Sequence, residues 1–181
     1  MNAEKMIQLA LDAGFTKCSI INTENLVFKP EYRKYCEENT CGNFGKNYAC
    51  PPDCKSPEEL KNKVLEYRKA VVFQLAGQVE SAFAKTETME LKKKHMLAAW
   101  DVVDQYRAEG VEGYQILATA CCLCPVCQKA EGKPCLHPEK VSPGMSAYCI
   151  DVTQMAAVCG MEMGWKETDV SYFSMYLFDK K

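Results

Sequence analysis

The sequence predicts an α/β or α+β fold, in which helices pack on a mixed sheet of about four strands and cysteine loops lie at strand ends. Two observations support this prediction: short apolar runs alternate with amphipathic stretches, and a cysteine-rich loop follows a strand-like run twice. No linker is long enough to divide the chain. We therefore expect residues 1–181 to form a single domain with two cysteine-rich metal-binding loops, at about 36–54 and 121–138.

Two helices in the first half of the chain have clear boundary signals. Residues 3–13 place apolar side chains at helical spacing, with Asn2 as the cap. The next helix begins in SPEELKNKVLEYRK, because Ser56 is a natural N-cap and Pro57 fits the first helical position. Glu59 can reach back to the cap and close a capping box, so this start is specified twice.

The longest predicted helix runs from about Thr86 to Glu109, and its apolar stripe is interpreted as core packing. The lysine run LKKKH is expected on the solvent side of this helix, with His95 solvated. A last helix is expected over 151–160, with Asp151 as its cap. The stripe of the long helix consists of Met89, Met96, Trp100, Val103 and Tyr106.

Four runs are rich in β-branched and aromatic residues and are predicted as strands. The first, 17–28, is a strand or a hairpin, and 70–77 is apolar enough for a strand buried on both faces. The run 113–120 leads the chain directly into a cysteine cluster, and 170–178 closes the sequence. Because helices separate these runs, we expect mixed or parallel strand pairing.

Charge and hydropathy exclude several classes of protein. The net charge of −2 and the absence of a basic patch argue against nucleic-acid binding. No apolar run approaches the length of about eighteen residues that spans a bilayer, and the first residues lack a secretory signal. We therefore expect a cytoplasmic protein without membrane association. Because thiols stay reduced there, its 12 cysteines indicate metal or redox chemistry rather than structural disulfides.

The second cysteine set is the more informative one. Cys121, Cys124 and Cys127 have strict C-x-x-C-x-x-C spacing, and Cys135 follows in the same loop. Three closely spaced thiolates and a fourth, more distant one are typical of a [4Fe–4S] cluster. Zinc is the alternative, although structural zinc sites usually combine two separate pairs of ligands. The fifth thiol, Cys122, is interpreted as a small buried residue beside the site rather than a ligand.

The first set comprises Cys36, Cys41, Cys50 and Cys54, at intervals that match no common ferredoxin pattern. The loop CGNFGKNYACPPDC contains glycines that permit tight turns and free backbone amides that can donate to cluster sulfurs. A second Fe–S cluster is the favoured interpretation, with zinc as its rival. Cys54 is the least secure ligand, and Cys149 is the alternative fourth ligand.

The remaining thiols and histidines suggest no catalytic pair. Cys18 and Cys159 lie on apolar elements and are expected to be buried and inert. His137, beside Cys135, is a candidate for a hydrogen bond to a cluster sulfur or for a ligand. The sequence has no P-loop, no dinucleotide fingerprint and no C-x-x-x-C-x-x-C triplet of the radical SAM type.

Two motifs carry a family resemblance. CGNFGKNYACPP, followed downstream by CLCPVCQKAEGKPCLHPE and SPGMSAYCIDV, resembles a family of uncharacterised prokaryotic proteins, domain of unknown function 2284, predicted to bind metal. The resemblance implies a cysteine-rich Fe–S protein and leaves the reaction open. Cys122 and Cys149 stand where the family has other residues. The positions that match the family pattern are Cys36, Cys41, Cys50, Pro51, Pro52, Cys121, Cys124, Cys127, Cys135, His137 and Pro138.

Three functions are consistent with this sequence. The first is a cytoplasmic electron carrier with one or two [4Fe–4S] clusters that exchanges electrons with redox partner proteins. The second is a zinc-stabilised binding module without a redox role. The third is a reductase in which the first cluster has an open iron site for substrate, and whether the protein is an enzyme is left open.

Overall fold

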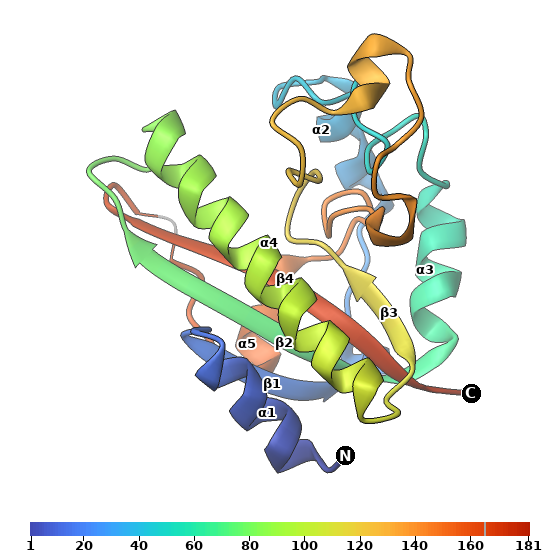
Figure 1. Cartoon of the computed structure of the whole chain (residues 1–181), viewed down its shortest axis with the longest axis vertical. Coiled ribbons are helices and arrows are strands. Elements are labelled where there is room, and N and C mark those ends of the chain that lie inside the picture. Colours follow the sequence, from blue (N-terminus) through green and yellow to red (C-terminus); the bar gives the residue numbers. More distant parts are fainter. Residues whose placement is uncertain (165) are drawn as a thin grey trace.

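The computed structural model describes residues 1–164 and 166–181 and has helices on both faces of one sheet (Figure 1). The helices are α1 (Ala3–Asp12), α2 (Arg33–Glu37), α3 (Pro57–Leu65), α4 (Lys85–Ala108) and α5 (Val152–Val158). The strands are β1 (Lys17–Asn22), β2 (Tyr67–Gln78), β3 (Gly113–Ile116) and β4 (Asp169–Lys180). The predicted α+β architecture with a sheet of four strands is confirmed.

The strands lie in the order β1-β2-β4-β3, and every pairing between them is antiparallel. The expectation of mixed or parallel pairing is therefore wrong for these described strands. β2 and β3, which α4 connects, run in the same direction, but β4 lies between them and pairs with both. The first cysteine loop and α3 return the chain to the end of β1, so that Asn22 pairs with Lys69.

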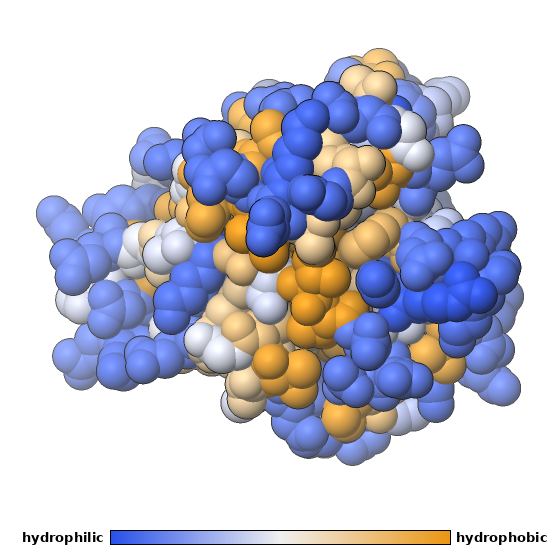
Figure 2. Space-filling model, turned by 90° about the horizontal axis from the view of Figure 1, so that it is seen from below, coloured by the Kyte–Doolittle hydropathy of each residue, from blue (hydrophilic) through white to orange (hydrophobic). Residues whose placement is uncertain are grey.

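Both faces of the sheet are covered. Helices α1 and α4 lie in front of it in Figure 1, where Phe73 of β2 packs with Trp100 and Tyr106 of α4. α3, α5 and residues 141–150 cover the other face, where Val72 and Met175 are fully buried. Seen from below, apolar side chains show between hydrophilic ones (Figure 2). No helix in the described residues is both long and apolar enough to cross a membrane.

The predicted helix starts are confirmed by their caps. The Asn2 side chain accepts a hydrogen bond from the Lys5 backbone N–H at 2.9 Å. Ser56 and Glu59 form the full capping box of α3. The Asp151 carboxylate caps α5 by accepting from the Gln154 backbone N–H at 3.1 Å. These local signals place helix starts correctly because a cap depends only on residues within one turn.

Two predicted strands end earlier than expected. β1 stops at Asn22, and a short 3-10 helix follows it over Thr23–Asn25. β3 stops at Ile116, because Leu117 forms an isolated parallel bridge with Gly144 instead of continuing beside β4. This change of partner takes the chain away from the sheet and into the second cysteine loop.

The expectation of a solvated His95 is wrong. The side chain is completely buried, its Nε2 lies 2.8 Å from Ser174 Oγ, and its ring meets Phe15 edge-on. Of the lysines beside it, Lys93 and Lys94 are exposed as expected. His95 lies on the same helix face as the buried Ala99, four residues further on, so the spacing carried a signal that the charged neighbours obscured. Met89, in contrast, is exposed and lies outside the core.

Burial of His95 predicts a pH-dependent loss of stability. Desolvation lowers the pKa of His95 to about 3, so the imidazole stays neutral in the folded protein. The unfolded chain binds a proton below about pH 6.5, and stability is therefore lost as the pH falls from about 6.5 towards 3. Urea denaturation at pH 7 and pH 5 should show a loss about 2 kcal/mol greater for the native protein than for His95→Gln.

The exposed His137 provides the control for this experiment. His137→Gln should keep the pH dependence of the native protein, because folding does not remove the exposed His137 side chain from water. Equal pH dependence in the native protein and His95→Gln would contradict the buried neutral histidine.

Candidate metal centre

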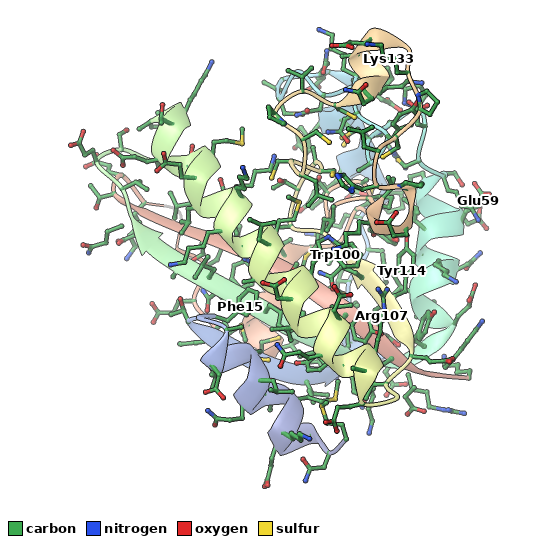
Figure 3. All side chains as sticks on the ribbon, viewed as in Figure 1. Phe15, Glu59, Trp100, Arg107, Tyr114 and Lys133 are labelled. Atoms are coloured by element: carbon green, nitrogen blue, oxygen red, sulfur yellow. The ribbon has the colours of Figure 1, made fainter. Side chains whose placement is uncertain are left out.

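The two cysteine loops lie side by side in one lobe, above β3 and next to α3 in Figure 1. The Asn47 side-chain amide donates to the Cys121 carbonyl at 2.8 Å and so joins the first loop to the second. The Tyr48 hydroxyl donates to the Lys133 carbonyl at 2.9 Å, near the tip of the lobe in Figure 3. We call this region, residues 33–56 and 119–140, the cysteine lobe.

Asn47 is the central link between the loops. Its side chain is buried and uses both polar ends, because its amide oxygen also accepts from the Ala49 backbone N–H at 3.0 Å. A buried amide that satisfies one backbone group in each loop holds the two loops in a fixed relation. The sequence analysis quoted this residue within a motif but assigned no role to it.

Three thiols of the first set line one cavity, with a volume of about 350 Å³. Cys36 comes from α2, and Cys41 and Cys50 from the loop that follows. The cavity lies between the cysteine lobe, α4 and β4. Its lining residues are Cys36, Cys41, Asn43, Phe44, Ala49, Cys50, Pro51, Met89, Lys92, Thr119, Ala120, Gly144, Ser146, Ala147 and Tyr172.

Gly144 forms part of this cavity wall by a close approach to the neighbouring chain. A Cβ at this position would lie 2.7 Å from the Thr119 backbone, closer than two such atoms can approach. Gly144 also forms the isolated bridge with Leu117, two residues before Thr119. Only glycine fits here without moving the wall of the cavity.

Cys54, the fourth member of the first set, has a different environment. Its sulfur accepts a hydrogen bond from Arg33 Nη1 at 3.3 Å, and Arg33 Nη2 donates to the Lys55 carbonyl at 2.7 Å. Cys54 lines a separate cavity, of about 470 Å³, together with Tyr114 and Tyr148. It is nevertheless near enough to Cys36 to affect its ionisation electrostatically.

Cys149, the alternative fourth ligand, is buried with its thiol directed at two backbone carbonyls. The sulfur lies 3.8 Å from the Pro30 oxygen and 3.9 Å from the Ala147 oxygen. Its backbone has a φ of 57°, in the left-handed region that few residues other than glycine adopt. Cys149 does not line the cavity beside Cys36.

Burial disfavours free thiolates in the first set. It raises the pKa of Cys50 to about 12, and the neighbouring thiols Cys41, Cys36 and Cys54 add to the rise. Burial also raises the pKa of Cys36, against the opposing charge of Arg33. Without a metal these two thiols are protonated at neutral pH, so metal binding must displace their protons.

In the second set, the structure brings Cys127 and Cys135 close enough to Cys121 to affect its ionisation. Burial raises the pKa of Cys121, the Leu123 backbone N–H opposes this by donating to the sulfur, and Cys127 and Cys135 contribute as charged neighbours. The Cys135 sulfur accepts from the His137 backbone N–H at 3.4 Å. Backbone N–H groups directed at thiol sulfurs are the contacts that stabilise cluster thiolates.

Cys124 and Cys122 lie in the same turn with different surroundings. Cys124, which lies between Cys121 and Cys127 in the sequence, is half-buried. The Cys122 thiol lies 3.8 Å from Met96 Sδ on α4, so it packs against the helix, as expected for a small residue beside the site. His137 is exposed, and only its backbone contacts the Cys135 sulfur.

The thiols of Cys18 and Cys159 lie outside the cysteine lobe, are partly buried, and are near enough to each other for Cys159 to add to the raised pKa of Cys18. Burial raises the pKa of Cys18 to about 12 and that of Cys159 to about 11. Both are therefore neutral thiols at physiological pH and poor nucleophiles. This agrees with the expectation that they are inert.

The thiols of the first set border a cavity and do not converge on one point. In the part of the chain that the structure describes, no group of three or more Cys, His, Asp and Glu side chains converges closely enough to hold one metal ion. Cluster thiolates bind separate iron atoms and so stand further apart than the ligands of one tetrahedral ion.

The comparison with protein families supports metal binding. A profile described as predicted metal-binding protein (DUF2284) matches residues 19–178. The chain belongs to this family. The match includes both cysteine sets, and it confirms the resemblance expected from the two motifs. No curated protein and no solved structure matches the chain.

Lys92 is a residue of this DUF2284 site that the sequence analysis placed with the solvated lysine run. It lies on α4 and lines the cavity with the three thiols of the first set. Lys92 lies four residues before the buried Met96 and therefore on the same helix face, whereas Lys93 and Lys94 are exposed. This spacing was the sequence signal that Lys92 faces the protein. The cavity therefore contains a cation contributed by the helical layer.

Removal of the Asn47 side chain should destabilise the cysteine lobe. Asn47→Ala leaves the Cys121 carbonyl and the Ala49 N–H without partners in a buried place, at a cost of about 2 kcal/mol. Urea denaturation at a fixed metal content measures this cost. Tyr48→Phe, which removes only a link on the surface of the lobe, should cost well under half as much, and equal losses would contradict the central role of Asn47.

Proposed function

We propose that this DUF2284 protein is an iron–sulfur protein that transfers electrons between redox partner proteins. The first set of cysteines holds one [4Fe–4S] cluster through Cys36, Cys41 and Cys50, and the second holds another through Cys121, Cys124, Cys127 and Cys135. The cytoplasm, where thiols stay reduced, is the compartment in which these ligands remain available.

The observation that carries this proposal is the cavity of about 350 Å³ bordered by three half-buried or exposed thiols. A single zinc ion needs four ligands converging on one point, whereas the three thiols of the first set border a cavity. A cavity with thiols on its wall supports a larger inorganic group, and the C-x-x-C-x-x-C spacing of the second set supports the same group independently.

Electron transfer is supported by the arrangement of the two sets. The Asn47–Cys121 hydrogen bond holds the two loops against each other, so two clusters would lie in one lobe. The lobe lies at one end of the molecule, where partner proteins can approach it (Figure 1). When bound, such clusters accept and release single electrons, and burial and N–H···S contacts set their reduction potentials.

Anaerobic purification tests this proposal directly. We expect a brown protein with iron and acid-labile sulfide in equal amounts and an absorption band that bleaches on addition of dithionite. Elemental analysis and visible spectroscopy measure these properties. A colourless protein with stoichiometric zinc would overturn the proposal in favour of a zinc-stabilised binding module.

Paired substitutions test the ligands of the second set. Cys124→Ser should remove about half of the iron, because a protein with two cluster sites loses one of them. Cys122→Ser should retain the full iron content, because its thiol packs on Met96 of α4. Iron and sulfide analysis of both variants decides this point, and equal losses would contradict the assignment.

A further inference from the structure

The cavity at the first cysteine set has two chemically different sides. Cys36, Cys41 and Cys50 belong to the cysteine lobe. Lys92 on α4 and Tyr172 on β4 come from the sheet and the helix that covers it. The cavity therefore extends from the proposed cluster ligands to a part of the molecule that contributes no thiol to it.

The first set places three thiols on this cavity. Cys54 lies near enough to Cys36 and Cys50 to raise the pKa of both thiols, but it lines a different cavity. Cys149 directs its thiol at the carbonyls of Pro30 and Ala147. A [4Fe–4S] cluster has four irons, each of which needs an outer ligand. Three cysteine ligands leave one iron for a ligand that the protein does not supply.

Lys92 introduces a positive charge into this cavity. Among the described lining residues it is the only charged side chain, and none of the ion pairs within the described chain involves it. The neighbouring lysine of the cysteine lobe, Lys129, is by contrast paired with Asp53 at 2.6 Å. A half-buried lysine without a carboxylate partner attracts an anion.

The rest of the cavity lining is largely apolar, which favours an anion with a small apolar body. Ala49, Ala120 and Ala147 contribute methyl groups, and Met89 borders the cavity with an exposed side chain. A small aliphatic body fits these walls, whereas a highly charged phosphate would meet a single cation. Carboxylate oxygen both binds iron and pairs with an ammonium group.

We propose that Cys36, Cys41 and Cys50 are the only protein ligands of the first cluster, and that a small aliphatic carboxylate binds in the cavity beside Lys92. The inference rests on the proposed function, because an open iron requires a cluster. It assigns Lys92 the role of recognising the ligand charge and gives Cys54 no part in binding iron.

Mild oxidation of the anaerobically purified protein tests the number of ligands. A cluster with an open iron gives one electron to ferricyanide and releases Fe²⁺, so that [4Fe–4S]²⁺ becomes [3Fe–4S]⁺ with a characteristic electron paramagnetic resonance signal. We expect this signal in the native protein and in Cys54→Ser, with unchanged iron content before oxidation. Loss of iron in Cys54→Ser equal to that in Cys50→Ser, in variants with native circular dichroism, would overturn the inference.

Ligand binding tests the role of Lys92. Propionate should change the electron paramagnetic resonance spectrum of the dithionite-reduced native protein, whereas propionamide, its neutral analogue, should not. Lys92→Met should weaken propionate binding about tenfold or more while retaining all iron, because a charge-assisted hydrogen bond is lost. Lys94→Met is the matched control, since Lys94 is exposed on the same helix, and should bind propionate normally.

The outcomes separate this inference from the proposed function. No iron in any anaerobic preparation would overturn both. Iron and sulfide without the three-iron signal, or without a spectral change on addition of propionate, would overturn only the open site and leave the electron carrier standing. Equal propionate affinity in Lys92→Met and Lys94→Met would likewise overturn the inference.

Discussion

The antiparallel pairing of β2 with β4 is the constraint on which the rest of the structure depends. Both strands are buried on both faces along their middle, and each provides the inner partner for an edge strand. β4 pairs with β2 on one side and with β3 on the other, so it joins segments that are distant in sequence. The position of the cysteine lobe follows from this arrangement, since β3 beside β4 delivers the second loop next to the first.

The cysteine lobe is held together by polar contacts, whereas the sheet is stabilised by apolar packing. Its two loops contain few large buried side chains and are joined by hydrogen bonds and an ion pair, with Asn47 in the buried position between them. Burial also keeps thiols such as Cys50 protonated in the absence of metal. Metal binding would therefore displace these protons and add cross-links to a part of the fold that contains few large buried side chains.

Elements defined by neighbouring residues were predictable from the sequence. Asn2, Ser56 with Glu59, and Asp151 all cap their helices as expected, and α4 differs from its predicted bounds by one residue at each end. For His95, a prediction from neighbouring residues alone was wrong. Its lysine neighbours indicated solvent, but the helix turns it towards Ser174 on a strand far away in the sequence, and the position of that strand is not encoded locally.

The sequence by itself determined four of the five described α-helices, the four strands, the family and the two sets of thiols, because caps, periodicity and cysteine spacing are properties of adjacent residues. Only the tertiary structure decided that β4 separates β2 from β3, that Cys54 meets Arg33 instead of the cavity, and that Lys92 faces the thiols. Each of these contacts joins segments distant in sequence. Their geometry is set by the packing of helices on the sheet, which no single segment contains.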